Sequence, residues 1–284
     1  MFQTLAKLAK VSRPISWINT AFPFAATYLV LGGGVDALFI IGTLFFLIPY
    51  NLLMYGINDV YDYESDIRNP RKNSIEGAAE AKSFHPTILK AAYGLAIPFV
   101  VALLLLSSWQ ASLVLIAVVF FVVAYSLKGF RFKEIPILDS ITSSFHFVGP
   151  MVYAIALLGF EPSAWPYALA VFLWGLASHA FGAVQDVIPD RKGGLKSIAT
   201  IIGARSTVYF SALLYTAAAL LMFIESGLVN VIAFAGLLYV LNIAPYFKIT
   251  DKTSAKANKA WRRFIWLNYL VGAMITIVLI LNSL

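Results

Sequence analysis

The stretch YGINDVYDYESDIRNPRK, residues 55–72, places carboxylates directly after a long apolar run. Asp59, Asp62, Glu64 and Asp66 stand close together in it. Such a cluster is unfavourable, because like charges repel each other and each carboxylate loses hydration near an apolar boundary. The rest of the chain decides what this stretch borders and what compensates its charge.

The chain is far more apolar than an ordinary soluble domain. Of its 284 residues 60% are hydrophobic and 12% are charged, and the mean hydropathy is +0.81. Apolar runs recur that are long enough to cross roughly 30 Å of hydrocarbon as helices. The sequence therefore predicts an all-α polytopic membrane protein, with residues 1–284 in a single membrane domain. We expect nine spans, at residues 14–30, 37–56, 91–107, 111–127, 138–158, 165–185, 206–224, 228–247 and 264–282.

The basic residues fall in alternate gaps between these spans. All 21 Lys and Arg lie in the N-terminal segment or after every second span, and the other gaps hold none. Because Lys and Arg are retained on the cytoplasmic side, we expect a multi-pass protein of the cell membrane with a cytoplasmic N-terminus, cytoplasmic long loops and an outer C-terminus. Topology and attraction to anionic lipid explain the net charge of +7, so we expect no nucleic-acid partner.

The quoted stretch forms the first of two acidic ladders on the predicted cytoplasmic side. If the second span continues as a helix, Asn58, Asp62 and Asp66 follow each other at intervals of four residues, and Asp59 shares their face. The second ladder lies in QDVIPDRKGG, where Asp186 and Asp190 are also four residues apart. Pro189 stands between these two and is able to end the helix there.

Clustered carboxylates need a positive partner. Carboxylate and amide oxygens suit Mg²⁺, which commonly joins one or two carboxylates to substrate phosphates, and Mn²⁺ accepts the same ligands. We assign metal-ligand roles to Asn58, Asp59, Asp62, Asp66, Asp186 and Asp190. Basic residues of the same loops and of the loop between them are candidate phosphate partners: Arg68, Arg71, Lys72, Lys128, Arg131, Lys133, Arg191, Lys192 and Lys196. The absence of cysteine excludes thiolate metal sites and cysteine nucleophiles.

Acid pairs, a divalent ion and nearby cations are the equipment for ionising an allylic diphosphate. The carbocation that results survives only where water is scarce, and aromatic ring faces stabilise it. Tyr55 and Tyr125 are aromatic candidates by position, although packing is the commoner role of a single aromatic residue in so aromatic a chain. Asn19, Asn51 and His179 are polar groups inside apolar spans, and they either line such a cavity or form hydrogen bonds in the core.

These motifs resemble those of the UbiA-type intramembrane prenyltransferases, which have nine transmembrane helices around a central cavity. Asn58, Asp62 and Asp66 match the family's N-x-x-x-D-x-x-x-D motif, and Asp186 and Asp190 match its D-x-x-x-D motif. The resemblance covers essentially the whole chain, and it implies catalytic roles for the four aspartates of these motifs.

Further residues carry the same resemblance. Tyr125 and Lys128 match a Y-x-x-K signature, and Arg13 in SRPISW looks like the family's arginine near the first helix. The resemblance implies that these three bind the diphosphate, and that Lys128 also takes part in catalysis. The stretch SIATIIGAR, residues 197–205, looks like the segment that follows the second motif.

A narrower resemblance is to bacterial lycopene elongases, carried by SRPISWINTAFPFAATYL, the quoted stretch with the residues before it, GAVQDVIPDR and WLNYLVGAMITI. It implies transfer of a dimethylallyl unit to lycopene in C50 carotenoid biosynthesis. An aromatic acceptor, as in quinone assembly, stays open as an alternative. A cation-coupled transporter is the alternative from another class, but its acids should lie near the bilayer midplane, and these lie at span ends. The sequence does not indicate an oligomeric state.

Overall fold

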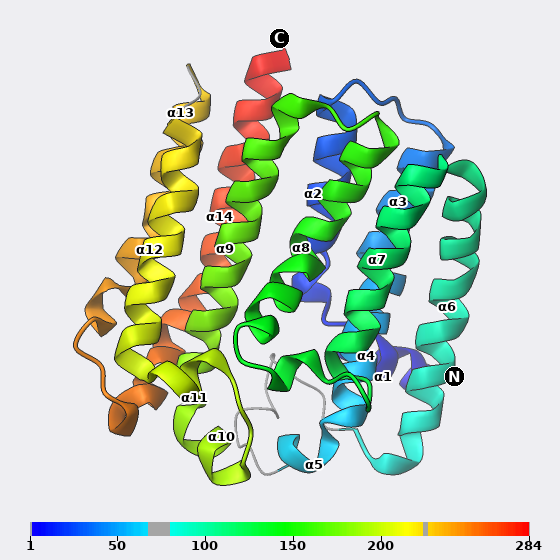
Figure 1. Cartoon of the computed structure of the whole chain (residues 1–284). Coiled ribbons are helices and arrows are strands. Elements are labelled where there is room, and N and C mark those ends of the chain that lie inside the picture. Colours follow the sequence, from blue (N-terminus) through cyan, green and yellow to red (C-terminus); the bar gives the residue numbers. More distant parts are fainter. Residues whose placement is uncertain (1, 68–79, 224–226, 284) are drawn as a thin grey trace. The chain divides into compact units, whose positions relative to one another are not determined.

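The computed structural model describes residues 2–67, 80–223 and 227–283, and within these ranges the secondary structure is helical, without strands (Figure 1). Eight helical segments in this part of the chain are long and apolar enough to cross a membrane. They run over Ala37–Tyr61, Lys82–Leu106, Trp109–Ser126, Leu138–Leu157, Pro162–Val184, Ala204–Phe223, Val229–Tyr246 and Asp251–Asn282. Each overlaps one of the predicted spans from the second to the ninth, which confirms an all-α polytopic membrane protein.

The segment predicted as the first span is shorter than the others. It consists of the 3₁₀ turn η1 (Pro14–Ser16) followed by α2 (Ile18–Val30), which has 13 residues. A helix of that length reaches about 20 Å, less than the roughly 30 Å of a hydrocarbon core. The total of nine spans therefore stays a prediction.

The chain divides into two compact units. The first is Met1–Phe132 with Phe145–Glu161, and the second is Lys133–Ser144 with Pro162–Leu284. Helices of the first unit are α1 (Phe2–Val11), α2, α3 (Ala37–Leu47), α4 (Pro49–Tyr61), α5 (Tyr63–Asp66), α6 (His85–Leu106) and α7 (Trp109–Ser126). Those of the second are α9 (Trp165–Val184), α10 (Val187–Gly193), α11 (Ile198–Ile202), α12 (Ala204–Phe223), α13 (Val229–Ile243) and α14 (Asn258–Ser283). The boundary runs through α8 (Leu138–Leu157), and the expected single membrane domain stays a prediction.

In the first unit α4 forms the centre of the core and carries the first acidic motif at its end. Tyr50, Leu53 and Ile57 of this helix are fully buried, and α4 packs against both α6 and α7. In lipid such packing depends on close contacts and hydrogen bonds more than on the removal of apolar surface from water. The polar end of α4 is therefore fixed by the packing of its apolar part.

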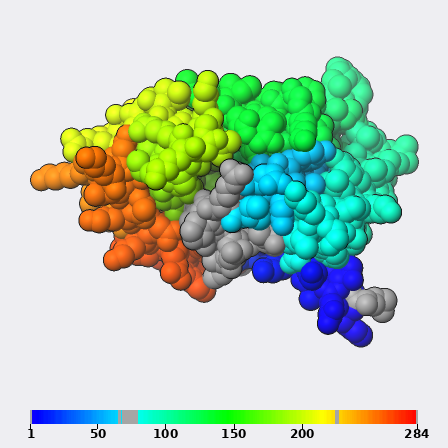
Figure 2. All heavy atoms as spheres, turned by 90° about the horizontal axis from the view of Figure 1, so that it is seen from below, coloured from blue at the N-terminus to red at the C-terminus, as the bar shows by residue number. Residues whose placement is uncertain are grey.

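The amphipathic helix α1 precedes these spans and is fastened to the same unit. Lys7 Nζ lies 2.7 Å from a carboxylate oxygen of Glu80 and 4.9 Å from the centre of the Phe84 ring. Figure 2 shows this N-terminal segment in blue at one edge of the face. These contacts hold α1 to the segment that leads into α6.

A proline separates α3 from α4, and the buried side-chain amide of Asn51 donates hydrogen bonds to carbonyl groups at the end of α3. Pro49 has no N–H to continue the helical hydrogen bonding of α3. The Nδ2 atom of Asn51 donates to the carbonyl oxygens of Phe46 and Leu47, at 2.9 and 3.0 Å, and to Thr20 Oγ1 at 2.7 Å. Asn51 is fully buried. Of the two alternatives open for Asn51, hydrogen bonding between helices is therefore the one that the structure shows.

The N-terminus of α3 is capped by Asp36. Its Oδ1 accepts a hydrogen bond from the backbone N–H of Phe39 at 2.9 Å, and its Oδ2 accepts one from the Tyr28 hydroxyl at 2.8 Å. Both bonds favour the charged carboxylate, so the Phe39 amide first and the Tyr28 hydroxyl second lower the pKa of Asp36. This arrangement is an N-cap of the ordinary kind, tied by a side chain to a second helix.

We predict that Asn51→Ala destabilises the protein by about 1 kcal/mol, because the Phe46 and Leu47 carbonyls lose a donor in an apolar environment. Thermal unfolding in detergent would show the loss as a lower melting temperature. Asn19→Ala removes a half-buried amide from α2 and is expected to have a smaller effect. Equal melting temperatures for Asn51→Ala and the wild type would contradict this role of Asn51.

Candidate functional site

The first acidic ladder is interrupted after its first turn. α4 ends at Tyr61, and Asp62 is its C-cap residue, with its backbone N–H 2.9 Å from the carbonyl oxygen of Asn58. The short helix α5 then begins at Tyr63. The predicted continuous helix therefore breaks at Asp62. A helix C-terminus carries partial negative charge, and carboxylates repel each other at a spacing of four residues, so extension through Asp66 would be unfavourable.

The spacing of Asn58 and Asp62 does bring their side chains together. Asn58 Nδ2 donates to Asp62 Oδ2 at 2.9 Å and to Ser126 Oγ of α7 at 3.1 Å. Arg131 Nη2 lies 3.6 Å from Asp62 Oδ1. Because the Asn58 amide makes both of these hydrogen bonds through its nitrogen, its carbonyl oxygen is the atom suited to a cation. A largely buried carboxylate, an amide and a guanidinium thus converge at the end of α4.

Asp59 has a different partner from Asp62. It is 4% exposed, and Arg13 Nη2 donates to its Oδ1 at 2.6 Å. The Arg13 guanidinium also lies over the Tyr55 ring, 4.1 Å from its centre. The sequence placed Asp59 among the metal ligands and Arg13 among the diphosphate contacts, whereas the structure pairs them with each other. These two roles stay predictions, while the observed pair neutralises both charges.

The two residues of the Y-x-x-K signature, Tyr125 and Lys128, lie in different environments. Tyr125 is half-buried on α7, with its ring edge-to-face against His146 at 5.0 Å between centres. Lys128 is exposed in the turn that follows α7. Arg131, another basic residue predicted in this loop, lies next to Asp62. A role of Lys128 in catalysis stays a prediction.

The second motif lies on a helix of its own. α9 ends at Val184, Asp186 is the N-cap residue of α10, and the N–H of Asp190 donates to the Asp186 carbonyl oxygen at 2.9 Å. Both acidic side chains are half-buried. Pro189 lies inside α10 and does not end it, because the first-turn position that it occupies has no helical partner for an N–H. The break falls instead between Val184 and Asp186.

The end of α10 is closed by Gly194. Its φ of 72° is the left-handed conformation that glycine adopts without steric cost. The N–H of Gly194 bonds the carbonyl oxygen of Arg191 at 3.2 Å, and the N–H of Leu195 bonds that of Asp190 at 2.9 Å. This pair of bonds is a Schellman motif, and it fixes the length of the helix that carries Asp186 and Asp190.

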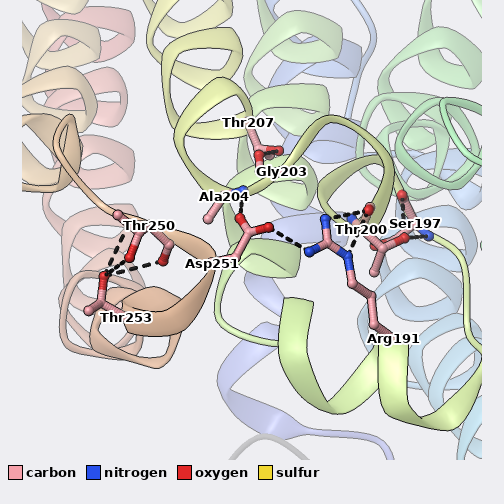
Figure 3. Close-up of polar contacts among 9 residues, drawn as sticks. All are labelled: Arg191, Ser197, Thr200, Gly203, Ala204, Thr207, Thr250, Asp251 and Thr253. Atoms are coloured by element: carbon pink, nitrogen blue, oxygen red, sulfur yellow. Dashed lines mark hydrogen bonds and ion pairs between the residues drawn. The ribbon is translucent and has the colours of Figure 1, made fainter.

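The basic residues of α10 differ in their contacts, and Figure 3 shows those of Arg191. Arg191 donates from Nε and Nη2 to the carbonyl oxygen of Thr200, at 3.0 and 2.7 Å, and from Nη1 to Asp251 Oδ2 at 2.5 Å. Lys192 is exposed. Both were predicted to contact the diphosphate, and the structure gives Arg191 contacts within the protein.

The other candidates are placed as follows. Asn19 is half-buried on α2, and His179 is half-buried on α9 with its Nδ1 3.0 Å from Ser140 Oγ. Arg68, Arg71, Lys72 and the side chain of Asp66 lie outside the described residues.

Two carboxylates with structural contacts were missed from the sequence. Asp139 is fully buried and accepts hydrogen bonds from the backbone N–H groups of Ser140 at 2.7 Å and Ile198 at 2.9 Å. Asp251 accepts from Arg191 and from the backbone N–H of Ala204. Asp139 stands at the start of a predicted span, and Asp251 lies between the last two predicted spans among many basic residues. The preference of aspartate for helix N-termini was the signal that could have indicated their contacts.

The described residues suit a magnesium ion by the chemistry of their donors. Asn58, Asp62, Asp186 and Asp190 offer the hard amide and carboxylate oxygens that Mg²⁺ prefers. In the described part of the chain, no three acidic or histidine side chains are grouped so that they could hold a metal ion by themselves.

The chain matches the model of the UbiA prenyltransferase family over residues 20–269. It is 49% identical, over 99% of its length, to a lycopene elongase/hydratase from Corynebacterium glutamicum, of which 98% is covered. It is 48% identical, over 93% of its length, to the C(50) beta-cyclic carotenoids biosynthesis protein LbtBC from Dietzia sp., of which 62% is covered.

The fold is similar to that of a UbiA homologue from Archaeoglobus fulgidus whose solved structure is bound to DMAPP and Mg²⁺. The TM-score is 0.68 at 18% sequence identity, and the match covers 94% of this chain and 99% of the other. At this identity the likeness concerns the fold alone.

We predict that Arg13→Met and Asp59→Asn each lower the free energy of unfolding by about 3 kcal/mol, because each leaves a mostly buried charge without its partner. The double variant Arg13→Met/Asp59→Asn should lose less than the sum of the two single losses. Equilibrium unfolding in detergent, arranged as a double-mutant cycle, measures the coupling. Strictly additive losses would show that the two side chains do not act as a pair.

Proposed function

Because the chain belongs to the UbiA prenyltransferase family, we propose that it transfers a C5 unit from dimethylallyl diphosphate to lycopene, with Mg²⁺ as its cofactor. The observation that carries the acceptor is 49% identity to a lycopene elongase/hydratase over nearly the entire chain. Similarity to a C50 carotenoid biosynthesis protein supports the same acceptor. The enzyme class is that of a prenyltransferase, which disfavours the cation-coupled transporter considered from the sequence.

Both acidic motifs are proposed to take part in binding the donor. Asn58, Asp62, Asp186 and Asp190 would hold Mg²⁺ through their side-chain oxygens. When bound, the ion supplies positive charge that stabilises a leaving pyrophosphate. This assignment is supported by the hard donor set and by the match to both family motifs.

Residues near the motifs are proposed to contact the diphosphate. Arg131 is positioned for this by its approach to Asp62, at 3.6 Å. Lys128 and Lys192 are exposed, so their ammonium groups are able to reach an anion. Arg13 bonds a carboxylate of the protein, and we therefore propose that it supports the site through Asp59.

The reaction proceeds by ionisation of the donor. The C–O bond to the diphosphate breaks, and its electron pair leaves with pyrophosphate. The terminal alkene of lycopene supplies the electron pair of the new C–C bond. The resulting cation either loses a proton or takes up water and then loses a proton. The apolar spans exclude bulk water from the allylic cation, and the proposal gives an aromatic ring such as that of Tyr125 the role of stabilising it.

We propose the cell membrane as the location, with the N-terminus and both acidic loops in the cytoplasm. The supporting observation is that all 21 Lys and Arg lie in alternate gaps. This orientation opens the donor site to a soluble diphosphate in the cytoplasm, while the hydrocarbon acceptor reaches it from the membrane.

Asp62→Asn and Asp186→Asn are each expected to abolish product formation, because each removes a charged oxygen ligand of the metal. The assay is expression in a lycopene-accumulating host, followed by chromatography and mass measurement of the pigments. Wild-type protein should add C5 units to lycopene. Glu64→Gln alters an exposed carboxylate that is ion-paired with Lys82, and this control should retain activity.

The same assay separates the alternatives. Unchanged lycopene together with a prenylated quinone precursor would replace the carotenoid acceptor with an aromatic one. Full activity in both aspartate variants would remove the metal and diphosphate assignment.

A further inference from the structure

A polar network outside both acidic motifs joins the loop before α14 to the helix that carries the second motif (Figure 3). We propose that Asp251 is a positioning residue for the donor site, which acts through Arg191 to hold α10 and its aspartates in place. This inference rests on the proposed function, because it takes Asp186 and Asp190 as ligands of a magnesium diphosphate. It assigns Arg191 to the support of that site.

Asp251 bonds two segments at once. Its Oδ1 accepts a hydrogen bond from the backbone N–H of Ala204, at 2.7 Å, and its Oδ2 accepts one from Arg191 Nη1, at 2.5 Å. Ala204 is the first residue of α12. One carboxylate therefore caps a long helix and also fixes the side chain next to Asp190.

Arg191 extends this connection to the segment after α10. Its Nε and Nη2 both donate to the carbonyl oxygen of Thr200, at 3.0 and 2.7 Å. Thr200 lies on α11, which begins with a capping box formed by Ser197 and Thr200. Since Arg191 bonds α11 on one side and Asp251 on the other, its side chain is held in a fixed direction between them.

The segment that supplies Asp251 is itself ordered by local bonds. Asp251 is the first residue of the 3₁₀ segment η7 (Asp251–Ala257), which starts with a capping box between Thr250 and Thr253. The Thr250 N–H donates to Thr253 Oγ1 at 3.1 Å. Figure 2 shows orange atoms of this part of the chain beside the yellow-green atoms of the second acidic loop. These bonds fix the backbone position of Asp251 at the start of η7.

Gly203 gives the carboxylate room to reach Ala204. Its φ of 82° with a ψ of 160° is a conformation in which residues with a Cβ are strained. A Cβ on Gly203 would lie 3.3 Å from Asp251 Oδ1. The sequence IIGAR therefore meets both the backbone and the space requirement of the contact between Asp251 and Ala204.

The second motif needs such support because α10 is short. It has seven residues, and an isolated helix of this length is not stable in water. Of its residues, Val187 is the fully buried one. The Schellman motif fixes the end of α10, and the contacts of Arg191 tie it to neighbouring elements. The position of Asp186 and Asp190 depends on these ties.

The exposure of the ion pair between Arg191 and Asp251 indicates which measured quantity it affects. The Arg191 and Asp251 side chains are 40% and 36% exposed, and exposed ion pairs contribute little to folding stability. Residues that orient metal ligands, by contrast, affect metal affinity strongly. A positioning role therefore predicts a large change in donor binding with a small change in melting temperature.

The test measures binding of inorganic pyrophosphate with saturating Mg²⁺ to the full-length protein in detergent, by calorimetry. Asp251→Asn keeps an oxygen that can accept from Ala204 but removes the charge that holds Arg191. We expect its affinity for the magnesium pyrophosphate to fall roughly tenfold or more. Arg191→Lys should show a similar loss, because one ammonium cannot replace the guanidinium contacts.

Asp36→Asn is the matched control. Asp36 also caps a helix and also bonds a second side chain, but it lies at the start of α3, away from both motifs in the sequence. Its melting temperature should fall at least as much as that of Asp251→Asn, and its pyrophosphate affinity should be unchanged.

The outcomes separate this inference from the proposed function. Wild-type binding with an unchanged affinity in Asp251→Asn would overturn the positioning role alone. An equal loss of affinity in Asp36→Asn would also overturn it, because any loss of stability would then suffice. Absence of magnesium pyrophosphate binding by the wild type would overturn the proposed donor site, and the positioning role with it.

Discussion

A carboxylate at the end of a membrane helix requires a compensating donor or cation, and this requirement organises the polar part of the protein. Asp59 has Arg13, and Asp62 has Asn58 and Arg131. Without such partners the carboxylates would repel each other and lose hydration at the apolar boundary. The helices supply the depth and direction of these groups, while the partners allow the groups to stay charged there.

The compensation differs between the two kinds of carboxylate. Asp59 and Asp251 bond arginine directly, at 2.6 and 2.5 Å. Asp62 bonds an uncharged amide and has its cation at 3.6 Å, beyond hydrogen-bond distance. The contacts of these three aspartates thus differ, although all three stand near helix ends.

Local patterns in the sequence were sufficient for the helices and for the contact between Asn58 and Asp62. Apolar runs predicted nine spans, and eight of these coincide with helical segments in the described part of the chain that are long enough to span a membrane. A four-residue interval placed two side chains on one helical turn. The same reasoning did not locate the breaks at Asp62 and after Val184, because a helical interval says nothing of where the helix stops. Pro189 was a misleading signal, since proline is tolerated in a first turn.

The partners of the carboxylates could not be predicted in this way. Arg13 and Asp59 are 46 residues apart, and Arg191 and Asp251 are 60 apart. No periodicity connects such positions, and each arginine has an equally good local explanation as a topological signal. Only the packing of the helices decides which arginine meets which aspartate.

The ion pair between Arg13 and Asp59 has a consequence for the backbone, because Arg13 adopts an unusual conformation. Its φ of 53° is left-handed, which costs a residue with a Cβ about 1 kcal/mol. The contacts of the Arg13 side chain with Asp59 and Tyr55 stabilise this backbone conformation. Removal of the negative charge at Asp59 would release the strain, and the turn between α1 and α2 would relax toward right-handed geometry. The turn that leads from α1 to α2 thus depends on this ion pair, in addition to the contacts of Lys7 that hold α1.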